Sequence, residues 1–175
     1  TQQQFKQKNK MSAKIKVLIL THMFPTKCNP VAGIFLLSQL KELQKLCDIR
    51  VVFPHAYVPK IKIFNPYYRF SGMPKQEKIK GIHVYHPKYF MFPRALFKSR
   101  FLHWYLTVES FFSYIASKKL AQNITEKWNP DIVHIHGTAS EALLGSSLKR
   151  KYEKPLLVTV YGEDVTRYSK QIPSK

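Results

Sequence analysis

The chain has 175 residues, 45% of them hydrophobic, which excludes a disordered polymer and allows one domain with a sizeable core. It has 29 lysines and arginines against 10 acidic residues, a net charge of +19 that predicts anionic partners such as nucleic acid, acidic lipid or phosphorylated substrates. The two cysteines, Cys28 and Cys47, lack metal-ligand spacing and indicate a reduced, cytoplasmic protein. Because no apolar run is long enough to span a bilayer, any membrane contact is expected to be peripheral, on the inner face of the cell membrane.

The first part of the chain differs from the rest. Residues 1–14 are polar and basic, match neither a signal peptide nor a transit peptide, and are expected to be a disordered or added lead-in. Residues 15–175 are expected to form one domain. The predicted alternation of strands and helices has not ended at Lys175, and we expect the chain to be part of a longer protein.

A strand, a helix and a second strand are predicted next. Residues 15–20 are apolar enough for a central strand of a parallel sheet, residues 34–46 carry one apolar stripe at helical spacing, and residues 49–53 form the second strand. The connection should be right-handed. Gly33 stands where the helix begins, and a glycine at a helix N-terminus allows close approach of an anionic group. Without a GxGxxG motif, a glycine needed only for the turn is the reading that the spacing favours.

Residues 54–80 are rich in proline, lysine and aromatic residues without a helical period, and they predict a long excursion from the sheet. Aromatic and basic side chains interleaved in this way could stack on nucleic-acid bases, enter lipid headgroups or pack back onto the domain. Residues 81–87 alternate between apolar and polar and predict a strand near the sheet edge, and residues 88–98 predict a second basic loop.

A long helix is predicted from Phe101 to Trp128, ended by Asn129 and Pro130. Its first turns, including Trp104, are apolar nearly all round, which fits either the core or a surface for another domain or a membrane, and we expect the core. The residues that keep helical spacing, and so predict the buried side, are Val108, Phe111, Phe112, Ile115, Ala116, Leu120 and Ile124.

Two short apolar runs, residues 131–137 and 155–164, each end in polar residues and a glycine, and residues 139–152 between them predict a helix. In an open parallel sheet, ligands bind at the carboxyl ends of the strands. The polar residues that end these two runs are therefore the first candidates for chemistry.

Histidines dominate the first of these runs. His136 comes last before Gly137 and is favoured as functional, whereas His134 is expected to be a buried, hydrogen-bonded histidine. We expect the two side chains to point to opposite faces unless the strand ends at His136, which makes them a poor metal pair. After the second run, Glu163 and Asp164 could cap a helix N-terminus, bind a ligand, or do both.

Five segments in register resemble the N-terminal half of a GT-B glycosyltransferase of family 4, the "group 1" transferases. They are residues 16–25, 29–35, 81–87, 131–137 and 158–164, and their order and spacing match along nearly the whole chain after Lys14. The resemblance implies an α/β fold, a Rossmann-like parallel sheet with helices on both faces, that mostly binds the acceptor. A second, C-terminal Rossmann-like domain, absent from these residues, would bind the nucleotide sugar. The implied reaction transfers a sugar from a nucleotide-diphosphate sugar with retention of configuration, without a further cofactor or an essential metal.

The resemblance also assigns roles by position. His136 matches the histidine that contacts the donor sugar near the reacting centre, and it is the catalytic candidate. The candidates for binding the donor and its phosphates are Gly33, Gly137, Gly162 and Asp164. The candidates on the acceptor side are His22, Asn29, Tyr161 and Glu163. The family often has a histidine where Tyr161 stands, and often a second glycine where Ala32 precedes Gly33.

The implied partners are a nucleotide sugar, a glycan or lipid-linked acceptor in polysaccharide biosynthesis, an anionic membrane surface and the missing C-terminal domain. The basic residues proposed for membrane contact are Lys149, Arg150, Lys151 and Lys154 together with residues 54–98. Because the family's paired-glutamate motif is absent from these residues, we predict little or no transferase activity for this chain alone. The alternatives are a basic nucleic-acid-binding module, which lacks an RNP, KH or helix-turn-helix pattern, and a nonenzymatic small-ligand-binding domain of similar fold.

Overall fold

The computed structural model describes residues 14–60, 67–90 and 102–162. The elements run in the order β1 (Ile15–Thr21), α2 (Ile34–Leu43), β2 (Cys47–Val52), β3 (His55–Ala56), η2 (Tyr67–Phe70), β4 (Gln76–Ile79), β5 (Ile82–Tyr85), β6 (Lys88–Tyr89), α3 (Leu102–Trp128), β7 (Ile132–His136), α4 (Ser140–Tyr152) and β8 (Leu156–Thr159). The predictions made for residues 1–13, for residues 91–98 and for Glu163 and Asp164 lie outside the described residues.

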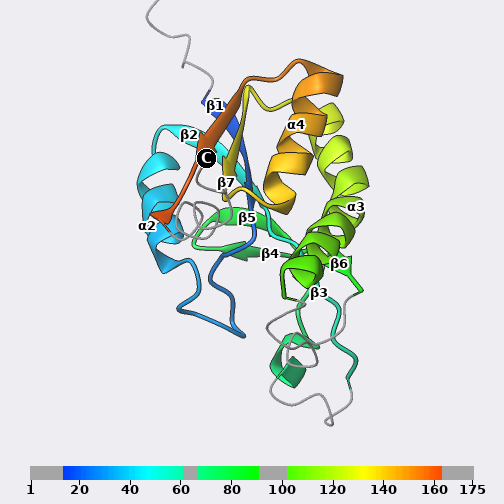
Figure 1. Cartoon of the computed structure of the whole chain (residues 1–175). Helices are drawn as coiled ribbons and strands as arrows, with labels where there is room; N and C mark the ends of the chain where they lie inside the picture. The colour runs from blue at the N-terminus through cyan, green and yellow to red at the C-terminus, as the bar shows by residue number, and fades with distance from the viewer. Residues whose placement is uncertain (1–13, 61–66, 91–101, 163–175) are drawn as a thin grey trace, which may run out of the picture.

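Six strands form one sheet in the order β4-β5-β2-β1-β7-β8 (Figure 1). All neighbours are parallel except β4 and β5, which form an antiparallel hairpin at one edge. The hairpin turns at Lys80 and Gly81, which both have positive φ values of 48° and 91°, as a tight two-residue hairpin turn requires. The prediction that residues 54–80 form an excursion from the sheet is therefore wrong at β4, which joins the sheet.

Helices cover both faces of the sheet, which confirms the predicted Rossmann-like α/β fold. Helix α2 lies on one face, over a core that includes Leu36 and Ile19, and helices α3 and α4 lie together on the other (Figure 1). The second core contains Leu20 and Val133 from the strands and Leu148 from α4. Because successive residues of a strand point to opposite faces, β1 supplies alternate side chains to the two cores.

The buried side of helix α3 agrees with the predicted one at Ile124 and Leu120 but differs from it in the first half of the helix. Its buried side is built largely from small residues, and the hydroxyls of Ser117 and Thr125 donate to the carbonyls one turn earlier, at 2.7 and 2.8 Å. The small side chains let α3 pack closely on α4, and their hydroxyls need no other partner. Trp104 is 60% exposed, so the expectation that the first turns are buried is wrong there. The predicted stripe is wrong at Phe111, Phe112 and Ile115, which are exposed.

Two further observations concern the surface. Strands β3 and β6 pair in parallel as a separate two-stranded sheet that packs against α3. Within the part of the chain that the structure describes, no helix is long and apolar enough to cross a membrane.

Candidate functional site at the carboxyl edge of the sheet

The carboxyl ends of β1, β7 and β8 lie side by side at one edge of the sheet. Thr21 of β1 is in register with His136 of β7, and His136 is in register with Thr159 of β8. The parallel arrangement therefore brings residues that are far apart in sequence to one place. The polar residues that end the predicted strands, among them His136, lie at this edge, and ligand binding there stays a prediction.

His136 is held by a tyrosine that follows the next strand. Its Nδ1 lies 2.7 Å from the hydroxyl of Tyr161, and the two rings are stacked with centroids 6.1 Å apart. Tyr161 also makes an edge-to-face contact with Phe35, with centroids 5.0 Å apart. Since Phe35 is in the first turn of α2, this contact places the start of α2 beside the ends of β7 and β8.

His134 lies on the same face as His136, and the prediction that they point to opposite faces is wrong. Their ring centroids are 4.0 Å apart. The physical reason is the twofold period of a strand, because residues separated by two positions share a face. His134 is hydrogen-bonded as predicted, with its Nε2 2.8 Å from the hydroxyl of Thr159, but it is half-buried and not buried. Among the described residues, no group of three potential ligands could hold a metal ion.

A second pair of polar residues joins β1 to α4. Nδ1 of His22 lies 3.4 Å from Oε1 of Glu141, whose side chain is 2% exposed, whereas the His22 side chain is 46% exposed. Ser140 donates to the same carboxylate oxygen, at 3.2 Å. Glu141 is in the first turn of α4, where the helix dipole favours a negative charge.

Gly137 makes room for this pair. It has a φ of +114°, and a Cβ at this position would lie 2.9 Å from the His22 ring and 3.6 Å from Oε2 of Glu141. Any larger residue would collide with the His22 ring. Because Gly137 directly follows His136, the pair formed by His22 and Glu141 approaches the backbone next to the histidine that ends β7.

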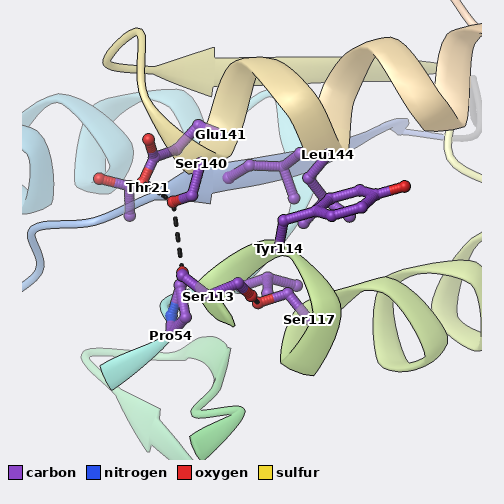
Figure 2. A pocket seen from close by; sticks show the side chains of 10 residues that line it. Thr21, Pro54, Ser113, Tyr114, Ser117, Ser140, Glu141 and Leu144 are labelled. Carbon is purple, nitrogen blue, oxygen red and sulfur yellow. Dashed lines mark hydrogen bonds between the residues drawn. The ribbon is translucent and has the colours of Figure 1, made fainter. Parts of the chain in front are cut away.

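Behind Glu141 is a small hollow of about 10 Å³ between α3, α4 and the ends of β1 and β2. Figure 2 shows the hydroxyls of Ser113 and Ser140 pointing toward one another across it, 3.3 Å apart. The volume is close to the room that one water molecule needs. The hollow is thus too small for a sugar.

Gly33 is the N-cap of α2 and has a φ of +68°. A Cβ here would lie 2.7 Å from the carbonyl oxygen of Met23, so the loop after β1 and the helix approach each other as only glycine permits. The first turn of α2 has no acidic residue. The backbone N–H groups of this turn therefore have no carboxylate from the same turn beside them.

Two polar atoms at the site are buried without a hydrogen-bond partner, Nε2 of His136 and Oε2 of Glu141. Only one other side-chain atom in the described ranges is in this state, Nε2 of His55. Burial lowers the pKa of His136 to about 4, and the neighbouring His134 adds to the effect. Burial also lowers the pKa of His134. Both imidazoles are therefore neutral near pH 7, and His136 keeps one ring nitrogen free to bond a ligand.

The structure brings together five of the predicted residues: His22, Gly33, His136, Gly137 and Tyr161. Gly162 follows Tyr161 and is exposed, with open space around the position of a Cβ. Asn29 instead closes a tight turn with Thr26 through backbone hydrogen bonds of 3.1 and 3.2 Å, and none of its described contacts reaches the site. Glu163 and Asp164 lie outside the described residues.

Sequence reasoning missed Glu141 and Thr159. A glutamate in the first turn of a helix is ordinary, so its type gives no warning. The available signal was its position in the first turn of the helix that directly follows β7 at the carboxyl edge. Thr159 ends β8 as an alternating polar residue and could have been paired with His134 from the parallel register.

The chain is similar in sequence to known proteins. The family described as "Glycosyl transferase 4-like" matches residues 95–175. A protein of Bacillus subtilis (strain 168), named as the teichuronic acid biosynthesis glycosyltransferase TuaC, is 29% identical over 157 residues. The match covers 88% of this chain and 38% of that relative, so the chain corresponds to well under half of the relative's length. These matches make the chain similar to family 4 glycosyltransferases, with the family match lying over residues 95–175.

Proposed function

We propose that this chain is the N-terminal, acceptor-side domain of a retaining glycosyltransferase, which moves a sugar from a nucleotide-diphosphate sugar to a glycan or lipid-linked acceptor at the membrane surface. The observation that carries the proposal is His136, buried at the carboxyl end of β7 with Nε2 unpaired and Nδ1 held by Tyr161. An unpaired buried nitrogen costs free energy, which a bound hydroxyl would recover.

His136 would act as a neutral hydrogen-bonding group. With a pKa of about 4 it carries no charge near pH 7, so its role is to orient a sugar hydroxyl and not to neutralise phosphate. The hydroxyl of Tyr161 selects the tautomer. If it donates to Nδ1, Nε2 carries the proton and donates to the substrate, and if it accepts, Nε2 is an acceptor.

The phosphates of the donor would lie nearer to α2. Its N-terminus offers backbone N–H groups and a positive dipole, and the contact of Phe35 with Tyr161 keeps it next to His136. Gly33 allows the loop after β1 to stay close to that helix. The charged diphosphate would thus bind at the N-terminus of α2, and a sugar hydroxyl would bind at the neutral His136 in the same site.

The charge of the chain fits an acidic acceptor. TuaC is named for the biosynthesis of teichuronic acid, an acid by its name, and this chain has a net charge of +19. We infer that the acceptor is an anionic glycan or is carried on an anionic lipid, as part of polysaccharide biosynthesis on the cytoplasmic side. A nucleic-acid-binding module has only this same charge and the interleaved aromatic residues of the basic segments in its support.

The test is sugar transfer by the longer protein, including the part expected after Lys175, with a panel of nucleotide-diphosphate sugars. Release of nucleotide diphosphate and the anomeric configuration of the product are measured. His136→Ala should lower kcat at least about 100-fold, whereas His83→Ala, at an exposed position of β5, should leave it unchanged. This chain alone should show little or no turnover. Absence of transfer with every donor, together with tight, salt-sensitive binding of nucleic acid, would overturn the proposal.

A further inference from the structure

One face of α3 presents large apolar side chains to solvent. Trp104, Phe111, Phe112 and Ile115, together called the α3 outer stripe, are 60, 54, 44 and 51% exposed. Their spacing of seven, one and three residues places them on one side of the helix, opposite the side of Ser117 and Ala121 that faces the core. Such a cluster on a soluble domain usually marks an interaction surface.

The stripe is confined to the first half of the helix. Along the same line, Ile115 is followed by Lys119, which is exposed, and then by Gln122 and Glu126. The second half of α3 therefore has the polar outer face of an ordinary surface helix. The apolar first half is a local feature that helix formation does not require.

The part of the sequence that precedes α3 and forms most of it is strongly basic. Residues 54–125 contain twelve lysines and arginines and only two acidic residues, Glu77 and Glu109. Both acids are already bonded, Glu77 to His86 at 3.0 Å and Glu109 to the hydroxyl of Tyr89 at 2.9 Å. Tyr89 belongs to β6, which packs against α3. The hydrogen bond of Glu109 therefore joins the first half of α3 to β6.

We propose that the α3 outer stripe docks onto an acidic lipid surface. Trp104, Phe111 and Ile115 enter the boundary between headgroups and acyl chains, and Lys119 with the basic residues around it contacts the anionic headgroups. The proposal deepens the proposed function and rests on it for the reason why a membrane is approached, since a lipid-linked acceptor would be found there.

A second copy of the chain fits the stripe less well. Four side chains on one helix provide a narrow surface, whereas stable protein interfaces bury about 1,200–2,000 Å². Two copies would also bring together chains that each have a net charge of +19. The same charge attracts an acidic membrane.

The stripe is also well placed for the site. Ser113, next to Phe112, contacts Ser140, and Ser140 contacts Glu141 at the carboxyl edge of the sheet. Docking through the stripe would therefore hold this edge near the lipid surface. An acceptor anchored in the membrane would reach His136 without leaving it.

The experiment measures binding of the 175-residue chain to phosphatidylcholine vesicles with and without about one quarter phosphatidylglycerol, by co-sedimentation at low and high salt. Phe111→Ser with Ile115→Ser should weaken binding to the acidic vesicles at least about tenfold. The matched control, Leu46→Ser with Leu143→Ser, removes side chains that are 74 and 49% exposed elsewhere and should bind like the wild type. Lys119→Gln should weaken binding about fivefold.

Tryptophan fluorescence reports the depth of insertion. Trp104 is 60% exposed and Trp128 is 7% exposed, so brominated acyl chains should quench Trp104 on binding. Wild-type binding by the Phe111→Ser, Ile115→Ser variant, no binding of the wild type, or binding without quenching would each overturn the proposal. A dimer in sedimentation velocity that this variant dissociates, without vesicle binding, would instead assign the stripe to a second copy. Vesicle binding without sugar transfer by the longer protein would contradict the proposed function alone.

Discussion

Nδ1 of His22 lies 3.4 Å from Oε1 of Glu141, and this contact joins the end of β1 to the first turn of α4. The carboxylate is buried and has one oxygen without a partner, while the histidine is half exposed at the edge where substrate would bind. The position of the His22 ring depends on the absence of a side chain at Gly137. Glu141 and Gly137 therefore both fix the position of the ring.

Gly137→Ala should displace His22 and destabilise the fold. The residue has a φ of +114°, which is strained for any L side chain, and its new Cβ would lie 2.9 Å from the His22 ring. We expect a loss of about 1–3 kcal/mol in the free energy of unfolding, measured by urea denaturation. Gly162→Ala is the matched control, because a Cβ there meets nothing within 4 Å, and it should change stability by less than about 0.5 kcal/mol. Equal effects of the two substitutions would contradict the steric argument.

Burial of His136 should make the protein less stable as the pH falls. Its pKa is lowered from 6.5 in the unfolded chain to about 4 in the fold, so between these values the unfolded state binds more protons. Stability is fully retained above pH 6.5 and is lost progressively as the pH falls toward 4. From pH 7 to pH 5 this one group should cost about 2 kcal/mol.

The measurement is urea denaturation of the wild type and of His136→Gln at pH 7 and pH 5. His136→Gln removes the titrating group, so its stability should fall by about 2 kcal/mol less than that of the wild type over this range. Burial lowers the pKa values of His55, His86 and His134 as well, so the variant should still lose some stability. An identical pH dependence of both proteins would show that His136 can be protonated in the folded state.

The sheet was predictable because apolar runs and glycines mark the ends of its central strands. Strand β4 was not, because Gln76–Ile79 is polar and its pairing depends on the turn at Lys80 and Gly81. The buried side of α3 was missed for a related reason. Hydrophobicity pointed to Phe111 and Ile115, whereas close packing on α4 selects small residues such as Ser117, whose hydroxyl bonds within its own helix.

The sequence placed His136, Gly137 and Tyr161 at the carboxyl edge of the sheet, where the structure also has them, but could not supply their contacts. The bond between His136 and Tyr161 joins residues 25 positions apart, and it follows from the parallel register of β7 and β8. Glu141 remained hidden because its chemistry depends on burial and on the approach of His22. The shared face of His134 and His136 follows from the period of a strand alone and was predictable.

Tyr161→Phe should lower kcat more than it changes KM. The substitution removes the hydroxyl 2.7 Å from Nδ1 of His136 but keeps the ring that contacts Phe35. Loss of one hydrogen bond that fixes the tautomer should cost about 1–1.5 kcal/mol, roughly a tenfold decrease in kcat of the longer protein. Nitrogen NMR of His136 should show a changed ratio of the two tautomers.

Tyr161→His is the companion variant, because a histidine often occupies this position in the family that the sequence resembles. If a hydrogen bond to Nδ1 is what matters, it should recover part of the activity that Tyr161→Phe loses. An unchanged kcat and an unchanged tautomer ratio in Tyr161→Phe would show that the hydroxyl does not control His136.

Hydrophobicity alone suggests that Phe111 matters more for the stability of the fold than Ser117. We expect the opposite. Ser117→Leu adds apolar carbon atoms at a position that is 1% exposed, next to a hollow of only about 10 Å³. Overpacking against α4 should cost about 2–3 kcal/mol in the free energy of unfolding. Phe111→Ser removes a large apolar side chain that is 54% exposed and should cost less than about 1 kcal/mol. Urea denaturation of both variants decides the matter, and a greater loss from Phe111→Ser would mean that the outer stripe is part of the core and not a surface.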